Sequence, residues 1–243
     1  IVSNKSFFES FRTWETAGFQ METAGYLAGG SKVWGQVNLN AENDESFTIR
    51  PGDAILPFFF FAHAHDGSLS LTGGLTMTRI VCNNTLSMSL GASSLTKFKH
   101  VGDVTFKVGE IHAITKKLVE SAKLEAEKFR FLEEKKLPDL QQINRFVNLI
   151  QGKDIDSDVG GKVHEDIAER FARSIGVKDF GSASHWDLLN VWTEMVSHDL
   201  GNHMTGESGG DRIARRLESQ WFGTGSKSND RATSAALQLA KAA

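Results

Sequence analysis

The stretch AILPFFFFAHAHDGSLSLTGGLTMTRIVCNNTLSMSL, residues 54–90, decides the fold of this 243-residue chain. Its only charged residues are Asp66 and Arg79, and it contains four consecutive phenylalanines, Phe58 to Phe61. Apolar surface of this extent must be buried, or the chain aggregates. The block therefore predicts the centre of the fold, and we expect residues 55–62 to form a central strand covered on both faces.

A polar break from His63 to Ser68 interrupts this block, and it is either a tight turn or a metal site. Asp66-Gly67 tolerates the positive φ of a two-residue connection, which favours a hairpin turn and an antiparallel return strand over residues 69–77. Gly73-Gly74 predicts a bulge in that strand. Residues 78–90 fit either element: Leu86, Met88 and Leu90 alternate as in a strand, whereas Ile80, Val81, Thr85 and Met88 have helical spacing, and of the two we favour the helix.

The residues before this block predict one helix and further strands. Aromatic residues spaced by three and four over residues 1–23 indicate a short amphipathic helix that docks on the main body. Residues 25–28 and 32–39, joined by the turn Gly29-Gly30-Ser31, predict a hairpin, and Phe47 to Arg50 predicts a short strand.

From Gly109 onward the pattern is helical. Apolar residues step by three or four for several turns until Pro138, which predicts one long helix. Further helices are expected over residues 140–150, 164–175, 186–200 and 213–221, and from Asn229 to the end.

Together these patterns predict an α+β fold. An antiparallel sheet built from hairpins in the N-terminal half packs with a long helix, and a mainly helical C-terminal half follows. We expect residues 1–108 to form the sheet region with its N-terminal helix. Residues 109–243 are expected to form a helical region packed on the sheet as one continuous domain.

Composition and charge exclude several classes of protein. The formal net charge is −3, so no field of the whole molecule draws the chain to nucleic acid or an anionic membrane, and such binding needs a local patch. The single cysteine, Cys82, excludes a disulfide framework and a multi-cysteine zinc site; we expect it in the core of a cytoplasmic protein. No uncharged stretch reaches transmembrane length. Because the sequence begins with Ile1 rather than Met, we expect a leading segment before it.

Cations alternate with aromatic rings from Ser94 to His100 and again at Phe106 and Lys107. Cations bind the phosphate backbone while aromatic faces stack on unpaired bases, so such a segment can hold a single strand without reading its sequence. The alternative is a solvated edge strand whose lysines prevent aggregation. The residues expected to form the nucleic-acid-binding surface are Arg50, Arg79, Lys97, Lys99 and Lys107 for phosphates, with Phe98 or Trp34 for stacking.

The pair His63 and His65 offers a different chemistry. At a strand end, residues two positions apart point to the same side, as paired zinc ligands do. With Asp66 they would suit a metal-dependent hydrolase or nuclease. The binuclear pattern His-x-His-x-Asp-His is incomplete, however, and the Asp-Gly turn explains these residues without a metal. We therefore expect no catalytic residue, no metal and no cofactor, and a protein that is not an enzyme.

The order of motifs resembles a known family. The resemblance rests on GYLAGGSKVWGQVNL, PFFFFAHAHDGSLSLTGGLTMTRIVCNNTLSMSL, KHVGDV, WDLLNVWTEMVSHD and WFGTGSKSNDRATSAALQL, and it covers the chain from Thr23 onward. Together these motifs resemble the uncharacterised phage- and plasmid-like protein family, a domain of unknown function. The resemblance implies a cytoplasmic protein made from a phage or plasmid genome alongside DNA replication or recombination genes, and it transfers no functional residue.

The expected layout is also similar to that of phage single-strand annealing proteins of the Red-beta and RecT kind, which assemble into rings or filaments and hold DNA in a groove. We therefore expect a non-enzymatic protein that binds single-stranded DNA, self-associates into a ring or filament and does not bind membranes. The first alternative is the metal-dependent hydrolase at His63, His65 and Asp66. The second is a phage structural or host-interaction protein, which would show a large apolar face on its helical half.

Overall fold

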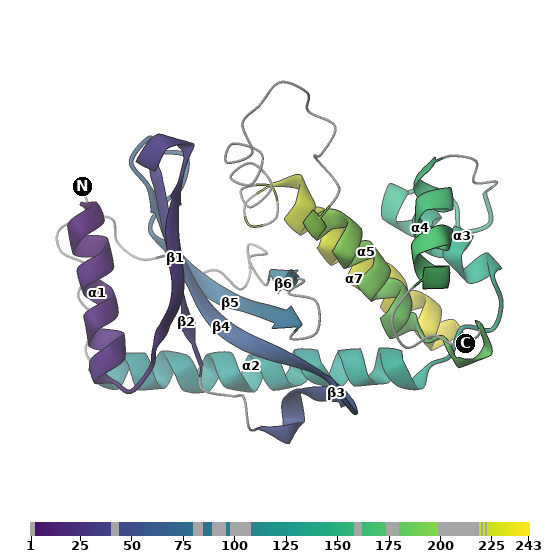
Figure 1. Ribbon diagram of the computed structural model, residues 1–243, viewed down its shortest axis with the longest axis horizontal. Coiled ribbons are helices and arrows are strands. Elements are labelled where there is room, and N and C mark those ends of the chain that lie inside the picture. The colour runs from purple at the N-terminus through teal and green to yellow at the C-terminus, as the bar shows by residue number, and fades with distance from the viewer. Residues whose placement is uncertain are drawn as a thin grey trace.

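A computed structural model describes residues 3–39, 44–79, 85–88, 96–97, 108–157, 162–173, 180–198, 219, 221 and 223–243 (Figure 1). The helices are α1 (Asn4–Thr16), α2 (Val108–Glu134), α3 (Gln141–Gln151), α4 (Lys162–Arg173), α5 (His185–His198) and α7 (Thr224–Ala242). The strands are β1 (Met21–Leu27), β2 (Lys32–Asn38), β3 (Thr48–Arg50), β4 (Asp53–Ala64), β5 (Thr72–Arg79), β6 (Thr85–Met88) and β7 (Thr96–Lys97). Three 3-10 helices lie at η1 (Ala28–Gly30), η2 (Glu45–Phe47) and η3 (Phe180–Ser182). The predicted α+β fold is confirmed.

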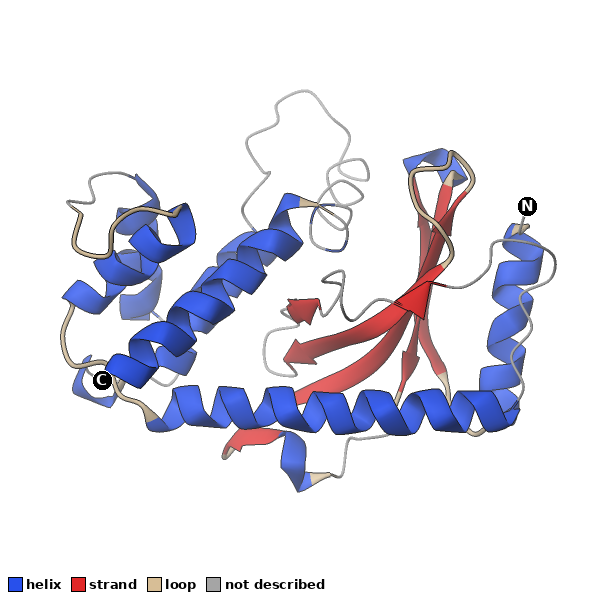
Figure 2. Ribbon diagram, turned by 180° about the vertical axis from the view of Figure 1, so that it is seen from behind, coloured by secondary structure: helices blue, strands red, loops and turns tan. Residues whose placement is uncertain are grey.

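The strands form one antiparallel sheet in the order β1-β2-β4-β5-β6, with β3 paired to β4 and β7 paired to β5. The predicted hairpin of β1 and β2 is confirmed. β4 and β5 also pair antiparallel, as predicted, and Gly67 has a φ of 76°, but residues 65–71 join them instead of a two-residue turn, and the return strand is Thr72–Arg79 instead of 69–77. Figure 2 shows the sheet standing on α2, which runs beneath both the sheet and the helices α5 and α7.

The four phenylalanines lie in the middle of β4, as predicted, and all are buried. Successive side chains of a strand point to opposite faces. Phe59 and Phe61 join the main core, whereas Phe60 packs in a second cluster with Trp34 and Trp221. Because both faces of β4 are covered, the strand contains an unbroken apolar run rather than an alternating one.

Helix α1 covers one face of the sheet. Ser3 caps it by accepting a hydrogen bond from the Ser6 amide, and its buried aromatic residues stack on the phenylalanines of β4. The Phe7 and Phe61 ring centroids are 5.1 Å apart. The predicted helix over 1–23 is therefore present but shorter, because Gly18 at a φ of 90° ends it and β1 begins at Met21.

Two predictions for the return strand are wrong. No bulge occurs at Gly73-Gly74; these glycines pair in regular register with Phe61 and Phe60. The helix expected over 78–90 is also wrong: β5 continues to Arg79, and residues 85–88 form β6. Pairing with β5 outweighs the helical spacing of the apolar residues.

The helical half follows the predicted periodicity. The long helix, α2, has 27 residues, and α3, α4 and α5 confirm the next three predicted helices. α7 begins at Thr224, five residues before the predicted start at Asn229. Four of its eight buried residues are alanines, whose small side chains allow α5 and α3 to approach closely. Of the helix expected over 213–221, only Ser219 and Trp221 are among the described residues. Cys82, which we expected in the core, lies outside the described residues.

The contact between α1 and β2 gives the first testable prediction. A Cβ atom at Gly35 would lie 2.5 Å from Cζ of Phe11, so Gly35→Ala must displace a ring fixed in the core. We expect this variant to lower the free energy of unfolding by about 1–3 kcal/mol in urea titrations. Gly109→Ala in α2 is the matched control, since no atom lies within 4 Å of its added Cβ. Equal stability of the two variants would contradict this packing.

Candidate functional site

The structure separates the residues predicted to bind nucleic acid. Arg50 and Arg79 meet at one buried cluster, and Trp34 lies in the second aromatic cluster. The backbone of Lys97 is described in β7, where it pairs with Thr72. The remaining predicted residues, Phe98, Lys99 and Lys107, lie outside the described residues.

Asp53, the first residue of β4, is the centre of the buried cluster, and its side chain is only 4% exposed. Arg79 at the end of β5 donates to both carboxylate oxygens, with Nε 2.6 Å from Oδ1 and Nη2 on Oδ2. Trp186 Nε1 donates to Oδ2 at 3.1 Å, and Arg50 Nε lies 3.4 Å from the same oxygen. Such a bidentate arginine pair fixes direction as well as distance.

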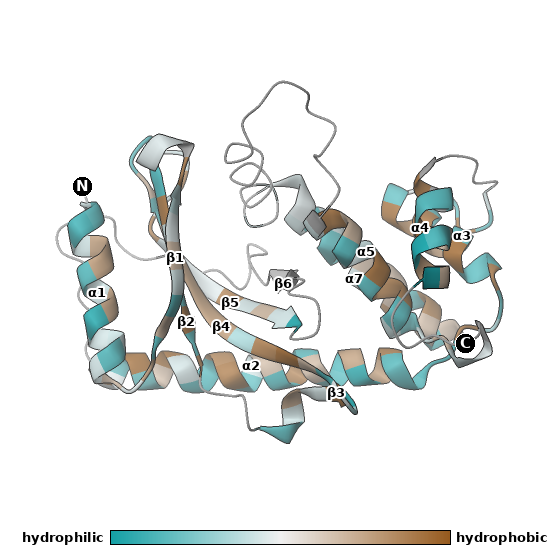
Figure 3. Cartoon of the chain, viewed as in Figure 1, coloured by the Kyte–Doolittle hydropathy of each residue, from teal (hydrophilic) through white to brown (hydrophobic). Residues whose placement is uncertain are grey.

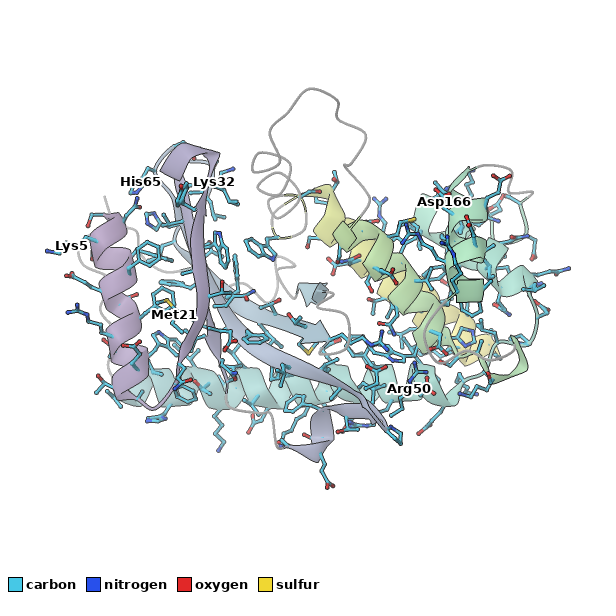
Figure 4. All side chains as sticks on the ribbon, in the orientation of Figure 1. Lys5, Met21, Lys32, Arg50, His65 and Asp166 are labelled. Atoms are coloured by element: carbon cyan, nitrogen blue, oxygen red, sulfur yellow. The ribbon has the colours of Figure 1, made fainter. Side chains whose placement is uncertain are left out.

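Arg50 connects this carboxylate to the helical half (Figure 4). Its Nη1 donates to Asp187 Oδ1 of α5 at 2.8 Å and to Glu133 Oε2 of α2 at 3.2 Å. Burial opposes the charge of Arg50, but the charges of Asp187, Glu133 and Asp53 and the hydrogen bond to Asp187 outweigh it and raise the pKa of its guanidinium. Arg50 therefore stays charged and holds β3, α2 and α5 together.

Ser184 and Asp187 complete the cluster at the start of α5. The Ser184 amide donates to Asp187 Oδ2 at 3.0 Å, and the Asp187 amide donates to Ser184 Oγ at 3.2 Å. This reciprocal pair is a capping box. Ser184 Oγ also lies 2.6 Å from Glu133 Oε2, so the cap of α5 is joined to α2.

The charges of the cluster balance. Arg50, Arg79 and Lys136 face the carboxylates of Asp53, Glu133 and Asp187. A buried charge that loses its partner destabilises the fold strongly, so the arrangement suits an anchor between the sheet and the helices. The expectation that Arg50 and Arg79 bind phosphate stays a prediction, and a phosphate would have to replace carboxylates already in place.

Trp34 is 8% exposed and packs against aromatic neighbours. Its ring centroid lies 4.4 Å from that of Trp221 and 6.4 Å from that of Phe60. The indole also fills the space left by Gly25 of β1, where a Cβ atom would lie 2.9 Å from it. A base could stack on Trp34 only after displacing Trp221, so the geometry favours a role in the core.

The two histidines of the polar break lie together but differ in environment. His63 is fully buried, with its ring 5.0 Å from Phe7 and 4.7 Å from His65. His65 Nε2 lies 2.5 Å from Asn4 Oδ1 at the start of α1. The pair thus packs against α1, beside the aromatic core (Figure 4).

Asp66 shapes the turn. Its Oδ1 accepts the Ser68 amide at 2.9 Å, and hydrogen bonds from the Ser68 hydroxyl and amide hold the pKa of Asp66 below its ordinary value. Oδ2 lies 3.4 Å from Ser31 Oγ. In the part of the chain that the structure describes, no group of three His, Cys, Asp or Glu side chains could hold a metal ion.

A groove lies between α2 and α7, with Leu75 of β5 also lining it. Its volume is about 810 Å³, and Leu124 on its wall is 60% exposed. Figure 3 shows hydrophobic and hydrophilic residues alternating along α2. The groove is lined by Leu75, Leu118, Ser121, Leu124, Glu125, Glu127, Lys128, Phe131, Leu237 and Lys241.

The chain belongs to the family described as Domain of unknown function (DUF932), whose model matches residues 1–221. This confirms the resemblance to a family of unknown function. No curated protein and no solved structure matches the chain. None of the helices in the described ranges is long and apolar enough to cross a membrane.

Sequence reasoning missed Glu133, Ser184 and Asp187 as members of the charge cluster. One local signal could have indicated two of them, because Ser184-x-x-Asp187 before the apolar run of α5 has the spacing of a capping box. The contact of Glu133 and Asp187 with Arg50 is long-range, and no sequence spacing indicates it.

The anchor role of the cluster gives the second prediction. Asp53→Asn removes the charge that Arg50 and Arg79 share, and we expect the free energy of unfolding, measured by urea titration, to fall by about 3–5 kcal/mol. Glu9→Gln is the control, since the pair that Glu9 forms with Lys5 at 3.8 Å is exposed and its removal should change stability by less than about 1 kcal/mol. A similarly small effect at Asp53 would show that the cluster is dispensable.

Proposed function

We propose that this chain is a non-enzymatic protein that binds single-stranded nucleic acid, and that its oligomer serves annealing or recombination of phage or plasmid DNA in the cytoplasm. The observation that carries the proposal is the pairing of Lys97 in β7 with Thr72 in β5. The segment in which cations and aromatic rings alternate therefore includes a strand of the sheet, β7. β7 lies beside β5, and β5 pairs with the central strand β4 on its other side. A rigid sheet is a better platform for a nucleic-acid strand than a free loop.

The proposal divides the predicted residues into two groups. Arg50, Arg79 and Trp34 hold the scaffold, because their side chains are engaged with carboxylates or aromatic rings. Lys97, Lys99 and Lys107 bind phosphates and Phe98 stacks on a base. The cations that bind nucleic acid are then confined to one segment, residues 97–107. A local patch of this kind is needed because the whole chain has a net charge of −3 and does not attract nucleic acid by itself.

Replacement of the three lysines tests the proposal. Each lysine that binds a phosphate of a single strand contributes about 0.7 to the slope of log affinity against log salt, so Lys97→Gln/Lys99→Gln/Lys107→Gln should reduce that slope by about 2. At low salt we expect roughly tenfold weaker binding or more. The measurement is fluorescence anisotropy of a labelled oligothymidylate over a series of salt concentrations.

The matched control replaces three exposed lysines elsewhere, as Lys116→Gln/Lys117→Gln/Lys153→Gln. It removes the same net charge, so a general electrostatic effect would weaken both variants alike. Equally weakened binding in the two variants, or no binding by the wild-type chain at low salt, would rule out a site at the lysine segment.

A second candidate is binding of a protein partner, and the groove between α2 and α7 favours it. Its leucines and Phe131 offer an apolar wall, with Glu and Lys side chains beside it, as an amphipathic helix requires. We expect peptides selected from a random library on the wild-type chain to be amphipathic and to bind a Leu124→Lys variant much more weakly. Leu140→Lys is the control for an exposed apolar side chain outside the groove. Peptides that bind all three proteins alike would exclude the groove.

A further inference from the structure

β1 is the end strand of the sheet. It pairs with β2 on one side, and among the described residues no strand pairs with its other side. An end strand presents a row of backbone donors and acceptors that can pair with another chain. The side of β1 away from β2 is therefore a ready surface for strand addition.

The side chains of β1 leave this edge accessible. Of the five large hydrophobic side chains exposed in the described residues, two lie on β1: Tyr26 is 71% exposed and Met21 is 37% exposed. Figure 4 shows Met21 on the side of β1 that faces α1. Thr23 and Ala24 are exposed as well, so most of the strand has solvent beside it.

β1 has few of the features that protect edge strands. Proteins usually block such edges with lysine, proline or a bulge. The sequence METAGYL contains neither lysine nor proline, and the register shift between Met21 and Thr23 confines its bulge to one end. The stretch Thr23–Leu27 pairs regularly with β2, and it carries no charged side chain.

We propose that β1 is the interface through which two copies of this chain pair, so that their sheets join edge to edge. This proposal rests on the proposed function, which includes an oligomer, and it identifies β1 as the surface through which the copies meet. In an antiparallel pair of two Thr23–Leu27 stretches centred on Gly25, Ala24 of one copy lies opposite Tyr26 of the other. Directly opposite residues share a face with Cβ atoms about 4.5–5.5 Å apart, so each exposed tyrosine ring covers the alanine of its partner.

We expect the partner at this edge to be a second copy of the chain, because two β1 strands can pair with each other in an antiparallel, symmetric register. In this register the paired stretch is free of charge, and the one charged side chain of β1, Glu22, lies outside it and opposite Ala28, so like charges do not meet. A symmetric contact of this kind closes at two copies. The expected unit is a dimer, and a ring or filament would be built from such dimers.

Mixed cysteine cross-linking tests the register. In a Cys82→Ser background, Ala24→Cys protein and Tyr26→Cys protein are oxidised separately and after mixing. A disulfide-linked dimer is expected on a non-reducing gel only from the mixture, because each cysteine faces the other position in the partner copy. A mixture of Glu165→Cys with Tyr26→Cys is the control, since Glu165 is exposed on α4, at the opposite end of the molecule from β1 (Figure 1). No link in the first mixture, or an equal link in the control, would overturn the proposal.

Light scattering supplies a second, independent measurement. The wild-type chain should show twice the mass of one chain, and Tyr26→Glu should show the mass of one while still unfolding in a single cooperative transition, because Tyr26 is largely exposed. Its unfolding midpoint should equal that of the wild-type chain only at concentrations where the dimer has dissociated. A monomeric wild-type chain would overturn the proposal. Binding of oligothymidylate by monomeric Tyr26→Glu is measured in parallel. If the wild-type chain and Tyr26→Glu are both monomeric but both bind oligothymidylate, only the proposed interface is refuted. If the wild-type chain is a dimer but binds no oligothymidylate, only the proposed function is refuted.

Discussion

Burial of four consecutive phenylalanines is the constraint from which the rest of the architecture follows. Neighbouring side chains of a strand point to opposite faces, so Phe58 to Phe61 can be buried together only if both faces of β4 are covered. α1 supplies cover on one face, and Trp34 with Trp221 supplies it on the other. Residues from near both ends of the chain thus meet on one strand, and each face contributes aromatic contacts beyond simple burial.

The same strand begins with the buried Asp53, which extends the argument from the core to the junction with the helices. Taking charges from water is costly unless each finds a partner, and here two arginines share three carboxylates from β4, α2 and α5. These ion pairs have defined directions, unlike apolar packing. They can therefore fix how the helical half sits on the sheet, while the phenylalanines supply most of the burial energy.

The sequence allowed the elements to be predicted far better than the site. Periodicity located α1, the β1-β2 hairpin, β4 and α2, because helix and strand patterns are local. The helix expected over 78–90 was wrong because residues 85–88 form a strand, β6, that pairs with β5, and this pairing between strands is not visible in the local spacing. Arg50 and Arg79 were expected on a surface because charged residues are mostly exposed. Asp53 lies only three positions from Arg50, but Glu133 and Asp187 lie 83 and 137 positions from it, so no local pattern could reveal those two contacts.

The position of β7 in the sheet bears on how an oligomer could hold a nucleic-acid strand. β1 and the β6-β7 side are opposite ends of the strand order, with β2, β4 and β5 between them. If two sheets join at β1, the two Lys97 segments lie at the outer ends of one continuous sheet, about 40 Å apart at roughly 4.8 Å per strand. Segments so far apart cannot grip the same few nucleotides. On the proposed function, each copy would therefore hold its own length of strand, and joining two copies at β1 would place the two lengths on one continuous sheet.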